Sequence, residues 1–464
     1  MKSTLISRFA LLYFFTIALW SCQEKEDTLP SVDPTSNEAA NRWILDLMSE
    51  VYYWLDDLGT PIAETSDPED YFEALLNRPT DRFSVIYPDY EELINSLSGI
   101  SLEAGYEFIL FKESNTSDNV IAEISYIKKN SPASSAGLRR GDVIQKINGT
   151  QMTVTNYRDI LGQTDQQHTV SYIRFNEEAN GFVAQPDLSL TPVQLSENPN
   201  FLDSIYMIGN QKIGYVVYHF FAPGTGEGST VYDDEMDAIF ANFKANDIDH
   251  LIVDFRYNSG GYVSSAVNLA SLIAPGASQS AVFSKTKYNA LVMQEVPELK
   301  NQQTAFKSKT QNLGNILTGS KVYILTSNRT ASASELIING LKPYMNVFLI
   351  GDKTTGKNVG SIPFEDEKNP QNKYGLLPIV SQSFNSLDQS DYSTGFTPNI
   401  ALKESSERLR PLGDVNELLL RTAISEITGT PPSGRFQKLD RMDMGSTLDS
   451  KIRSGKMIES YDFK

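Results

Sequence analysis

Residues 250–261 have the sequence HLIVDFRYNSGG, and this stretch decides the fold class. Its first half, 250–255, is a short apolar run typical of a buried β-strand, and its second half is a turn that ends in two glycines. Paired glycines let a backbone come close to a ligand or to another chain segment, because they carry no Cβ atom. A tight connection from a strand to a helix has the same pattern, so the turn alone leaves both interpretations open.

Strand-like and helix-like runs alternate on both sides of this stretch, over residues 204–430. Such alternation is typical of α/β folds. The runs lie at residues 212–218, 234–245, 250–255, 263–273, 321–326 and 347–351. Residues 431–464 are polar and charged with little periodicity, and we expect them to form a polar tail.

Two further patterns precede residue 204. In residues 38–98 apolar side chains, many of them aromatic, recur at helical spacing, and Asp67-Pro68 is a typical helix start, which predicts a small N-terminal helical domain. Residues 99–192 instead contain short β-like runs and predict a separate β-rich domain. We therefore expect a multidomain chain, in agreement with its length of 464 residues.

Residues 330–335, TASASE, follow the strand-like run 321–326 and precede an apolar helix-like run. Ser332 is therefore expected at the N-terminus of a helix, where free N–H groups and the helix dipole stabilise a developing oxyanion, as acyl transfer requires. Ser-x-x-Glu before an apolar run is also a capping box, in which Ser332 would cap the helix and Glu335 would reach back to it. The local pattern alone favours the cap.

The glycine-rich segment 351–358, GDKTTGKN, nearly matches a phosphate-binding Walker A loop. It is excluded as one because Asn358 lacks the hydroxyl that would hold magnesium, and because the residues up to Pro363 do not continue as a helix. Lys357 is then a lysine in a glycine-rich loop, where a desolvated, neutral amine can take a proton from a nearby hydroxyl. A solvated surface lysine is the alternative interpretation.

Other candidate bases and metal ligands are scarce. The chain has three histidines, His168, His219 and His250, and no two of them have the spacing of metal ligands. A Ser-His-Asp triad would have to use His219 or His250, and no nucleophile elbow accompanies either. Cys22 is the only cysteine, which excludes a disulfide and a cysteine-based zinc site. We predict no metal and no cofactor, and Lys357 as the better-supported base.

Residues 131–144, SPASSAGLRRGDVI, and the Asn-Gly pair at 148–149 resemble the PDZ domains of bacterial proteases. A small-residue helix, a Gly-Leu exit, a Gly-Asp turn and an Asn-Gly hairpin occur in the order of that family. The resemblance implies that the β-rich region 99–192 is a PDZ-like domain, which captures an extended or C-terminal peptide segment by adding it as a strand. We expect this strand beside residues 106–111, with its terminus near Gly105.

This PDZ-like region is followed in order by DFRYNSGG, TASASE and TGK, at 254–261, 330–335 and 355–357, and the whole is similar to the C-terminal processing, or tail-specific, peptidases. The resemblance implies a crotonase-like α/β catalytic core over 204–430. Several relatives carry a lysine-orienting glutamine four residues after the lysine. The family resemblance implies these site residues: the nucleophile Ser332, the general base Lys357, oxyanion-hole N–H groups at Gly260, Gly261 and Ala333, and Ser361 in the place of that glutamine.

The N-terminus predicts export and a lipid anchor. Residues 1–21 carry Lys2 and Arg8 before an apolar run that is too short to span a bilayer, which is typical of a signal peptide. LWSC at 19–22 resembles a bacterial lipobox, which implies lipidation of Cys22, a tether over 22–37 and a place in the bacterial cell envelope. The alternative is an ordinary signal peptide with an incidental cysteine. Cleavage leaves 38 basic and 58 acidic residues, a net charge of −20, which argues against nucleic acid as a partner.

Together these features predict an exported, membrane-anchored serine endopeptidase with protein or peptide substrates and a Ser332–Lys357 dyad. The alternative is a catalytically weak or inactive peptide-binding lipoprotein of the same fold, and Ser361 is the feature that favours it. The sequence leaves the physiological substrate, the oligomeric state and the membrane face open.

Overall fold

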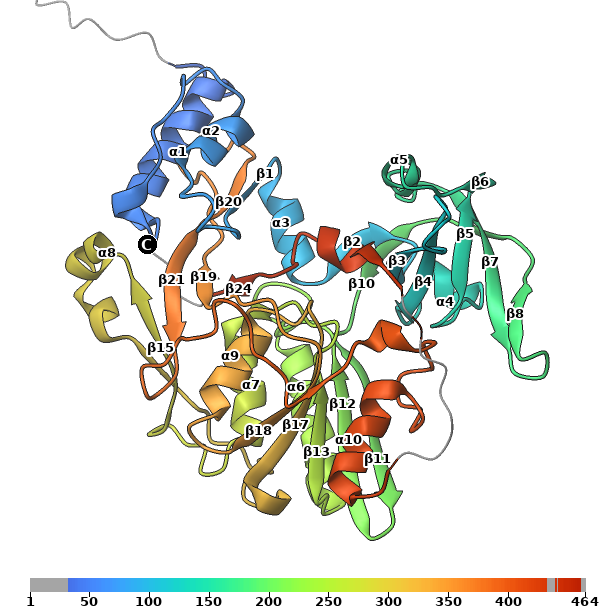
Figure 1. The fold of residues 1–464 in the computed structure, drawn as a ribbon. Helices are drawn as coiled ribbons and strands as arrows, with labels where there is room; N and C mark the ends of the chain where they lie inside the picture. Colours follow the sequence, from blue (N-terminus) through green and yellow to red (C-terminus); the bar gives the residue numbers. More distant parts are fainter. Residues whose placement is uncertain (1–31, 432–438, 440, 460–464) are drawn as a thin grey trace, which may run out of the picture.

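The computed structural model describes residues 32–431, 439 and 441–459. The predicted signal peptide and Cys22 lie outside these residues. Figure 1 shows a helical N-terminal part at the upper left, a β-rich part at the right and an α/β part below them. The predicted multidomain α/β fold is confirmed.

The α/β part is built on a six-stranded sheet. Five neighbouring strands are parallel, and the edge strand β11 is antiparallel to β12. In spatial order the strands are β11 (Asn200–Ile208), β12 (Gln211–Tyr218), β13 (His250–Asp254), β17 (Lys321–Thr326), β18 (Asn346–Gly351) and β22 (Ile400–Ala401).

Helices cover both faces of this sheet (Figure 1). Helices α6 (Val231–Ala245), α7 (Val263–Ile273) and α9 (Ala333–Leu341) share the larger hydrophobic core with one face. Helix α10 (Leu418–Thr428) packs on the opposite face. Alternate residues of each central strand therefore enter different cores, which explains why these strands are apolar on both faces.

A second six-stranded sheet lies beside the first and carries part of the candidate site. Its strands are, in spatial order, β14 (Gly261–Tyr262), β24 (Met457–Ile458), β19 (Val359–Ser361), β21 (Ile379–Phe384), β15 (Val282–Tyr288) and β16 (Gln303–Ala305). Helix α8 (Ala290–Glu295) follows β15. Strand β24 thus lies between the strands that contain Gly261 and Ser361.

The N-terminal part contains the predicted helices. They are α1 (Asn37–Val51), α2 (Pro68–Leu75) and α3 (Tyr90–Leu97). The Asp67 side chain accepts the N–H of Glu69, and Pro68 is the first helical residue, so the predicted helix start is confirmed. Strand β1 (Val85–Tyr87) pairs with β20 (Gly375–Leu377), which attaches this part to the α/β part.

The PDZ-like part is a twisted antiparallel sheet with two short helices. Asn148 and Gly149 have φ angles of 51° and 72°, the positive values that a tight Asn-Gly hairpin turn requires. Strand β2 (Ile100–Glu103) pairs with β10 (Val193–Ser196) at the entrance to this part. Its other elements are β3 (Tyr106–Lys112), β4 (Val120–Ile127), α4 (Pro132–Ser135), β5 (Val143–Ile147), β6 (Thr150–Gln151), α5 (Tyr157–Leu161), β7 (His168–Asn176), β8 (Gly181–Ala184) and β9 (Leu188–Leu190).

The predicted polar tail is wrong for residues 441–459, which we call the C-terminal segment. Its strand β23 (Asp443–Ser446) pairs with β3, and its strand β24 pairs with β14 and β19. Met457 and Ile458 are fully buried. The sequence pattern did not predict these strands, because the longest apolar run in the segment is two residues and because the pairing partners lie far away in the sequence.

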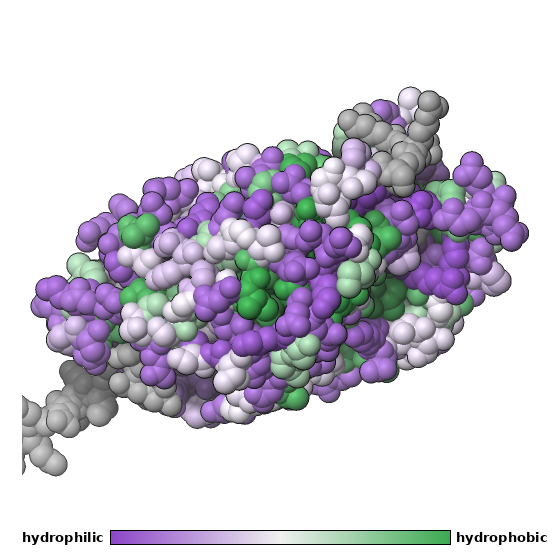
Figure 2. All heavy atoms as spheres, turned by 90° about the horizontal axis from the view of Figure 1, so that it is seen from below, coloured by the Kyte–Doolittle hydropathy of each residue, from purple (hydrophilic) through white to green (hydrophobic). Residues whose placement is uncertain are grey.

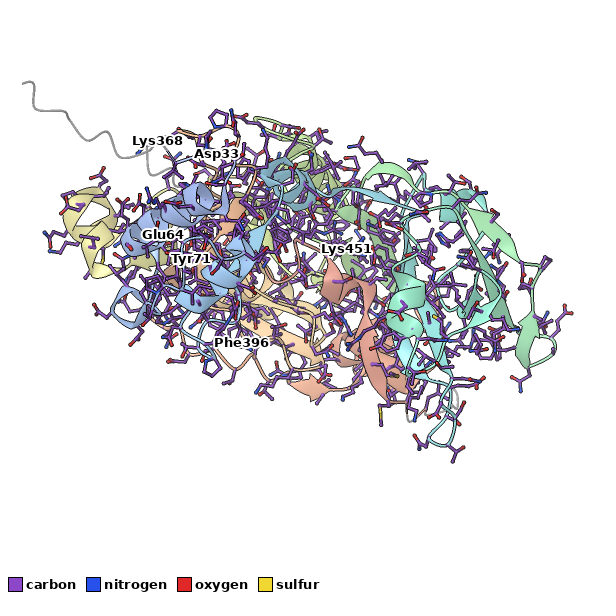
Figure 3. The ribbon with its side chains drawn as sticks, turned by 90° about the horizontal axis from the view of Figure 1, so that it is seen from above. Asp33, Glu64, Tyr71, Lys368, Phe396 and Lys451 are labelled. Atoms are coloured by element: carbon purple, nitrogen blue, oxygen red, sulfur yellow. The ribbon has the colours of Figure 1, made fainter. Side chains whose placement is uncertain are left out.

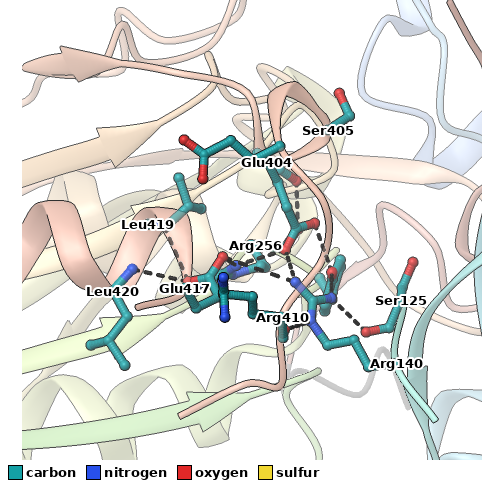
Figure 4. Close-up of polar contacts among 12 residues, drawn as sticks. Ser125, Arg140, Arg256, Glu404, Ser405, Arg410, Glu417, Leu419 and Leu420 are labelled. Carbon is teal, nitrogen blue, oxygen red and sulfur yellow. Dashed lines mark hydrogen bonds and ion pairs between the residues drawn. The ribbon is translucent and has the colours of Figure 1, made fainter. Parts of the chain in front are cut away.

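A buried charge cluster joins the PDZ-like and α/β parts (Figure 4). The fully buried guanidinium of Arg256 forms ion pairs with Asp254 at 2.8 Å and with Glu404 and Glu417 at 2.6 Å each. Arg140, from the Arg-Gly-Asp turn of the PDZ-like part, pairs with the same Glu404 at 2.5 Å. Glu404 thus links a buried arginine of the PDZ-like part to a buried arginine of the α/β part.

The surface viewed in Figure 2 is largely hydrophilic, with hydrophobic residues in small groups. A surface of this kind suits the excess of acidic residues in the chain. Within the part of the chain that the structure describes, no helix has the length and apolar character that crossing a membrane requires.

Candidate active site

Ser332 lies at the junction between strand β17 and helix α9, as predicted. It is fully buried, and its φ and ψ of 62° and −116° are a strained conformation for a residue other than glycine. Its hydroxyl oxygen has no hydrogen-bond partner among the described residues. The hydroxyl and Glu335 are arranged as a capping box, but no side-chain hydrogen bond from Ser332 caps the helix. Half of the predicted capping box is therefore present: Glu335 reaches back to the N–H of Ser332, whereas the serine hydroxyl has no hydrogen-bond partner among the described residues.

The carboxylate of Glu335 holds the serine and the lysine loop together. Its Oε2 accepts the backbone N–H of Ser332 at 2.9 Å and that of Lys357 at 2.8 Å. Its Oε1 accepts the N–H of Gly356 at 2.7 Å and the hydroxyl of Thr354 at 2.5 Å. Burial raises the pKa of Glu335, although these hydrogen bonds oppose the rise. One carboxylate thus fixes the backbones of both predicted dyad residues side by side.

Lys357 is fully buried, so the alternative of a solvated surface lysine is wrong. Burial, and next the positive charge of Lys456, lower the pKa of Lys357 well below its ordinary value. Its Nζ lies 4.9 Å from the centre of the Phe83 ring and donates a hydrogen bond to the Gly455 carbonyl at 2.7 Å. The lysine therefore has the desolvated environment that favours a neutral amine.

The predicted glycine pair lies against Ser332. A Cβ at Gly260 would lie 2.6 Å from the Ser332 Cβ, so only glycine leaves room for this serine. The N–H of Gly260 donates to the Asn258 side chain at 2.9 Å, whereas the N–H of Gly261 donates to the carbonyl of Lys456 at 2.6 Å. Of the two glycines, Gly261 is therefore the one whose N–H points at a peptide carbonyl.

Ala333 and Ser361 complete the predicted set. Ala333 begins helix α9, where backbone N–H groups have no acceptor within the helix. Ser361 is fully buried in β19, and its hydroxyl has no hydrogen-bond partner among the described residues, so it does not bond to Lys357. The Gly455 carbonyl holds the lysine amine instead. Cys22 lies outside the described residues.

The histidines are engaged elsewhere. His168 bonds to Tyr106 and His250 to Gln211, at 2.8 and 2.7 Å, and His219 lies 3.4 Å from a carboxylate oxygen of Glu197. Over the described ranges, no cluster of three or more potential metal ligands occurs.

Sequence reasoning missed the residues that contact the dyad from distant segments. Phe83 comes from the N-terminal part, and Gly455 and Lys456 come from the C-terminal segment. The capping-box pattern predicted the bond from Glu335 to the Ser332 N–H, but it gave no sign that the same carboxylate also binds the N–H groups of Gly356 and Lys357.

Family models match three parts of the chain. A model described as "Peptidase family S41" matches residues 212–402, and one for the "Peptidase S41 N-terminal domain" matches residues 39–85. The chain belongs to peptidase family S41. A PDZ-domain model matches residues 123–174 of this S41 chain. The resemblance drawn from the sequence motifs is thereby confirmed.

Individual relatives of the S41 chain are distant. A Staphylococcus aureus protein named "Probable CtpA-like serine protease" is 24% identical over 235 residues, which are 50% of this chain and 40% of that protein. The "Carboxy-terminal processing protease CtpB" of Bacillus subtilis is 25% identical over 358 residues, 72% of this chain and 63% of that protein. The chain thus spans less than two thirds of either relative.

One solved structure resembles the S41 chain over most of its length. The crystal structure of a provisionally named S41 protease from Bacteroides fragilis has a TM-score of 0.71 and 28% sequence identity. The match covers 84% of this chain and 98% of the other. The two chains therefore share the multidomain architecture described above.

Proposed function

We propose that this S41 chain is an exported, lipid-anchored serine endopeptidase that uses Ser332 as nucleophile and Lys357 as general base. The observation that carries the proposal is a fully buried lysine whose backbone is bound to the same carboxylate as the backbone of a strained, buried serine. Protein or peptide substrates would be captured as an added strand by the PDZ-like domain. Cys22 would anchor the mature protein in the cell envelope.

In the proposed reaction the Ser332 Oγ forms a bond to the scissile carbonyl carbon while Lys357 Nζ takes its proton. The tetrahedral oxyanion would accept hydrogen bonds from the N–H groups of Gly261 and Ala333. Lys357 then returns the proton to the leaving amine as the peptide bond breaks, which leaves an ester on Ser332. Water then loses a proton to Lys357 and attacks that ester, and Lys357 returns the proton to Ser332 Oγ as the carboxylic acid product leaves. Gly260 contributes space for Ser332, since its N–H is bound by Asn258.

The direct test is a gel assay of purified residues 23–464 with an unfolded protein as substrate. Wild type should produce fragments and Ser332→Ala none. Ser334→Ala is the matched control, because Ser334 is also buried at the start of α9 but donates its hydroxyl to the Asn258 carbonyl at 3.1 Å. Cleavage by Ser332→Ala at the wild-type rate would refute the assigned nucleophile.

A second candidate function is peptide binding without catalysis. It is favoured by one observation: the Ser332 hydroxyl is not hydrogen-bonded to Lys357, whose amine is bound by Gly455. Catalytic hydrogen bonds are often long before substrate binds, so this geometry does not exclude the enzyme. Peptide binding with no cleavage by any variant would favour the binding protein.

A further inference from the structure

The C-terminal segment occupies the edge at which the PDZ-like domain is expected to take a peptide. Strand β23 pairs antiparallel with β3, with Ser446 opposite Ile109. The Ser446 hydroxyl donates to the Phe108 carbonyl at 2.8 Å, and the Phe108 N–H donates to the Thr447 hydroxyl at 3.1 Å. The antiparallel pairing of β23 with β3 is strand addition, made here by the chain itself, and the two hydroxyl contacts accompany it.

From β3 the segment runs towards the dyad along a row of acidic side chains. Lys451 Nζ lies 2.8 Å from Glu103 and 3.0 Å from Glu107, and Arg453 lies 2.6 Å from Glu197. Figure 3 labels Lys451 on this segment, between the PDZ-like part and the middle of the molecule. The positive charges of the segment thus match the negative charges of the surface beneath it.

At the dyad the segment presents two consecutive carbonyls. The Gly455 carbonyl accepts a hydrogen bond from Lys357 Nζ at 2.7 Å, and the Lys456 carbonyl accepts the Gly261 N–H at 2.6 Å. A Cβ at Gly260 would lie 2.4 Å from the Lys456 oxygen and 2.9 Å from the Ser332 Oγ, so these two oxygens border the same small space. The segment therefore uses the base and an oxyanion donor that the proposed reaction needs.

We propose that residues 441–459 lie along the path of the substrate, from the edge of β3 to Ser332, and hold the peptidase in an inhibited state. This inference rests on the proposed function. A substrate would be an extended peptide that pairs with the same strand edges and becomes bound only when the segment leaves. The segment would then be the chain's own competitive inhibitor.

The segment is held both by buried apolar residues and by exposed ion pairs. The exposed ion pairs can be reversed by substitution without changing the buried residues. Met457 and Ile458 are buried, whereas Asp443 and Asp449 are exposed and bind Arg329 at 3.3 and 2.8 Å. Burial of a lysine also opposes docking: it lowers the pKa of Lys456 to about 8, so at neutral pH the docked segment must lose a proton or bury a charge.

The test variant is Asp443→Lys/Asp449→Lys/Lys451→Glu, which reverses three charges that bind the segment. The matched control reverses the same charges at exposed residues on α6 and in the loop before it, Glu227→Lys/Asp234→Lys/Lys244→Glu. Both are measured as residues 23–464 for melting temperature, for hydrogen exchange of 441–459, and for kcat/KM on an unfolded protein.

The test variant should exchange faster over 441–459 and over β3 while it stays folded. Its kcat/KM should rise at least about fivefold. If docking of the segment becomes weaker by about 1 kcal/mol in free energy, the fraction of molecules whose segment has left the site rises by that factor. The control should match wild type. A synthetic peptide of residues 441–464 should return the test variant to the wild-type rate, and a scrambled peptide should not.

Two results would overturn the inference while the peptidase function stands or stays open. One is unchanged exchange over 441–459 in the test variant. The other is release of the segment with an unchanged or lower rate, which would make the segment a fixed part of the active site while the peptidase function stands. Cleavage by none of the proteins, even with the segment released, would refute the peptidase function itself and the inhibitory role with it.

Discussion

Substitution of Gly260 by alanine tests whether glycine is required there to place the nucleophile. Its φ of 114° is strained for alanine, and the new Cβ would lie 2.6 Å from the Ser332 Cβ. Carbon atoms in ordinary contact are about 3.5–4.0 Å apart, so Ser332 would have to move by about 1 Å. A displacement of this size at a reacting atom costs about 10²-fold in rate. We therefore expect kcat of Gly260→Ala to fall about 100-fold.

The matched control is Gly209→Ala. Gly209 also has a positive φ, of 61°, but a Cβ there meets no atom within 4 Å. Both variants place alanine at a positive φ, and only Gly260→Ala carries the clash with Ser332. Because the Gly260 Cβ would also approach Lys456, both are compared in the charge-reversed variant that releases the C-terminal segment. Equal kcat for the two glycine variants, at equal melting temperature, would refute the reasoning.

Three further predictions concern the proposed base Lys357, the residue Ser361 four positions after it, and the proposed lipid anchor at Cys22. Because the pKa of Lys357 is lowered well below 10.5 by burial and by Lys456, kcat/KM should rise with pH as the amine loses its proton and level off well below pH 10.5; a rise only near pH 10.5 would contradict a buried neutral base. Ser361→Ala should keep the wild-type kcat, since that hydroxyl makes no hydrogen bond to the lysine, and a large loss would restore its orienting role. Cys22→Ser should move the protein out of the membrane fraction or leave it unprocessed, so unchanged fractionation would disprove the lipid anchor.

Elements with a strong local pattern were predictable from the sequence. The run 250–255 corresponds to β13, the apolar run at 321–326 to β17, and the serine motif to the start of α9. In each case the buried residues form an apolar pattern in the sequence, and a turn or cap residue marks the end of the element. The Asn-Gly hairpin of the PDZ-like domain was predictable for the same reason.

Contacts between distant segments were not predictable. Nothing near Met457 indicates that it would form a strand between Gly261 and Ser361, because β-pairing partners are chosen by the whole fold. Likewise the glycine-rich loop identified Lys357 as a candidate, but its burial depends on Phe83 and on the C-terminal segment.

The central claim, that a neutral Lys357 is the base for Ser332, is tested most directly by kcat of Lys357→Arg beside Lys357→Ala. Arginine has a side chain of similar length but stays positively charged, because it cannot give up its proton near neutral pH. Both variants should therefore lose about 10²–10⁴-fold in kcat, the contribution typical of a general base. Cleavage of an unfolded protein by Lys357→Arg at near the wild-type rate would contradict the Ser332–Lys357 mechanism.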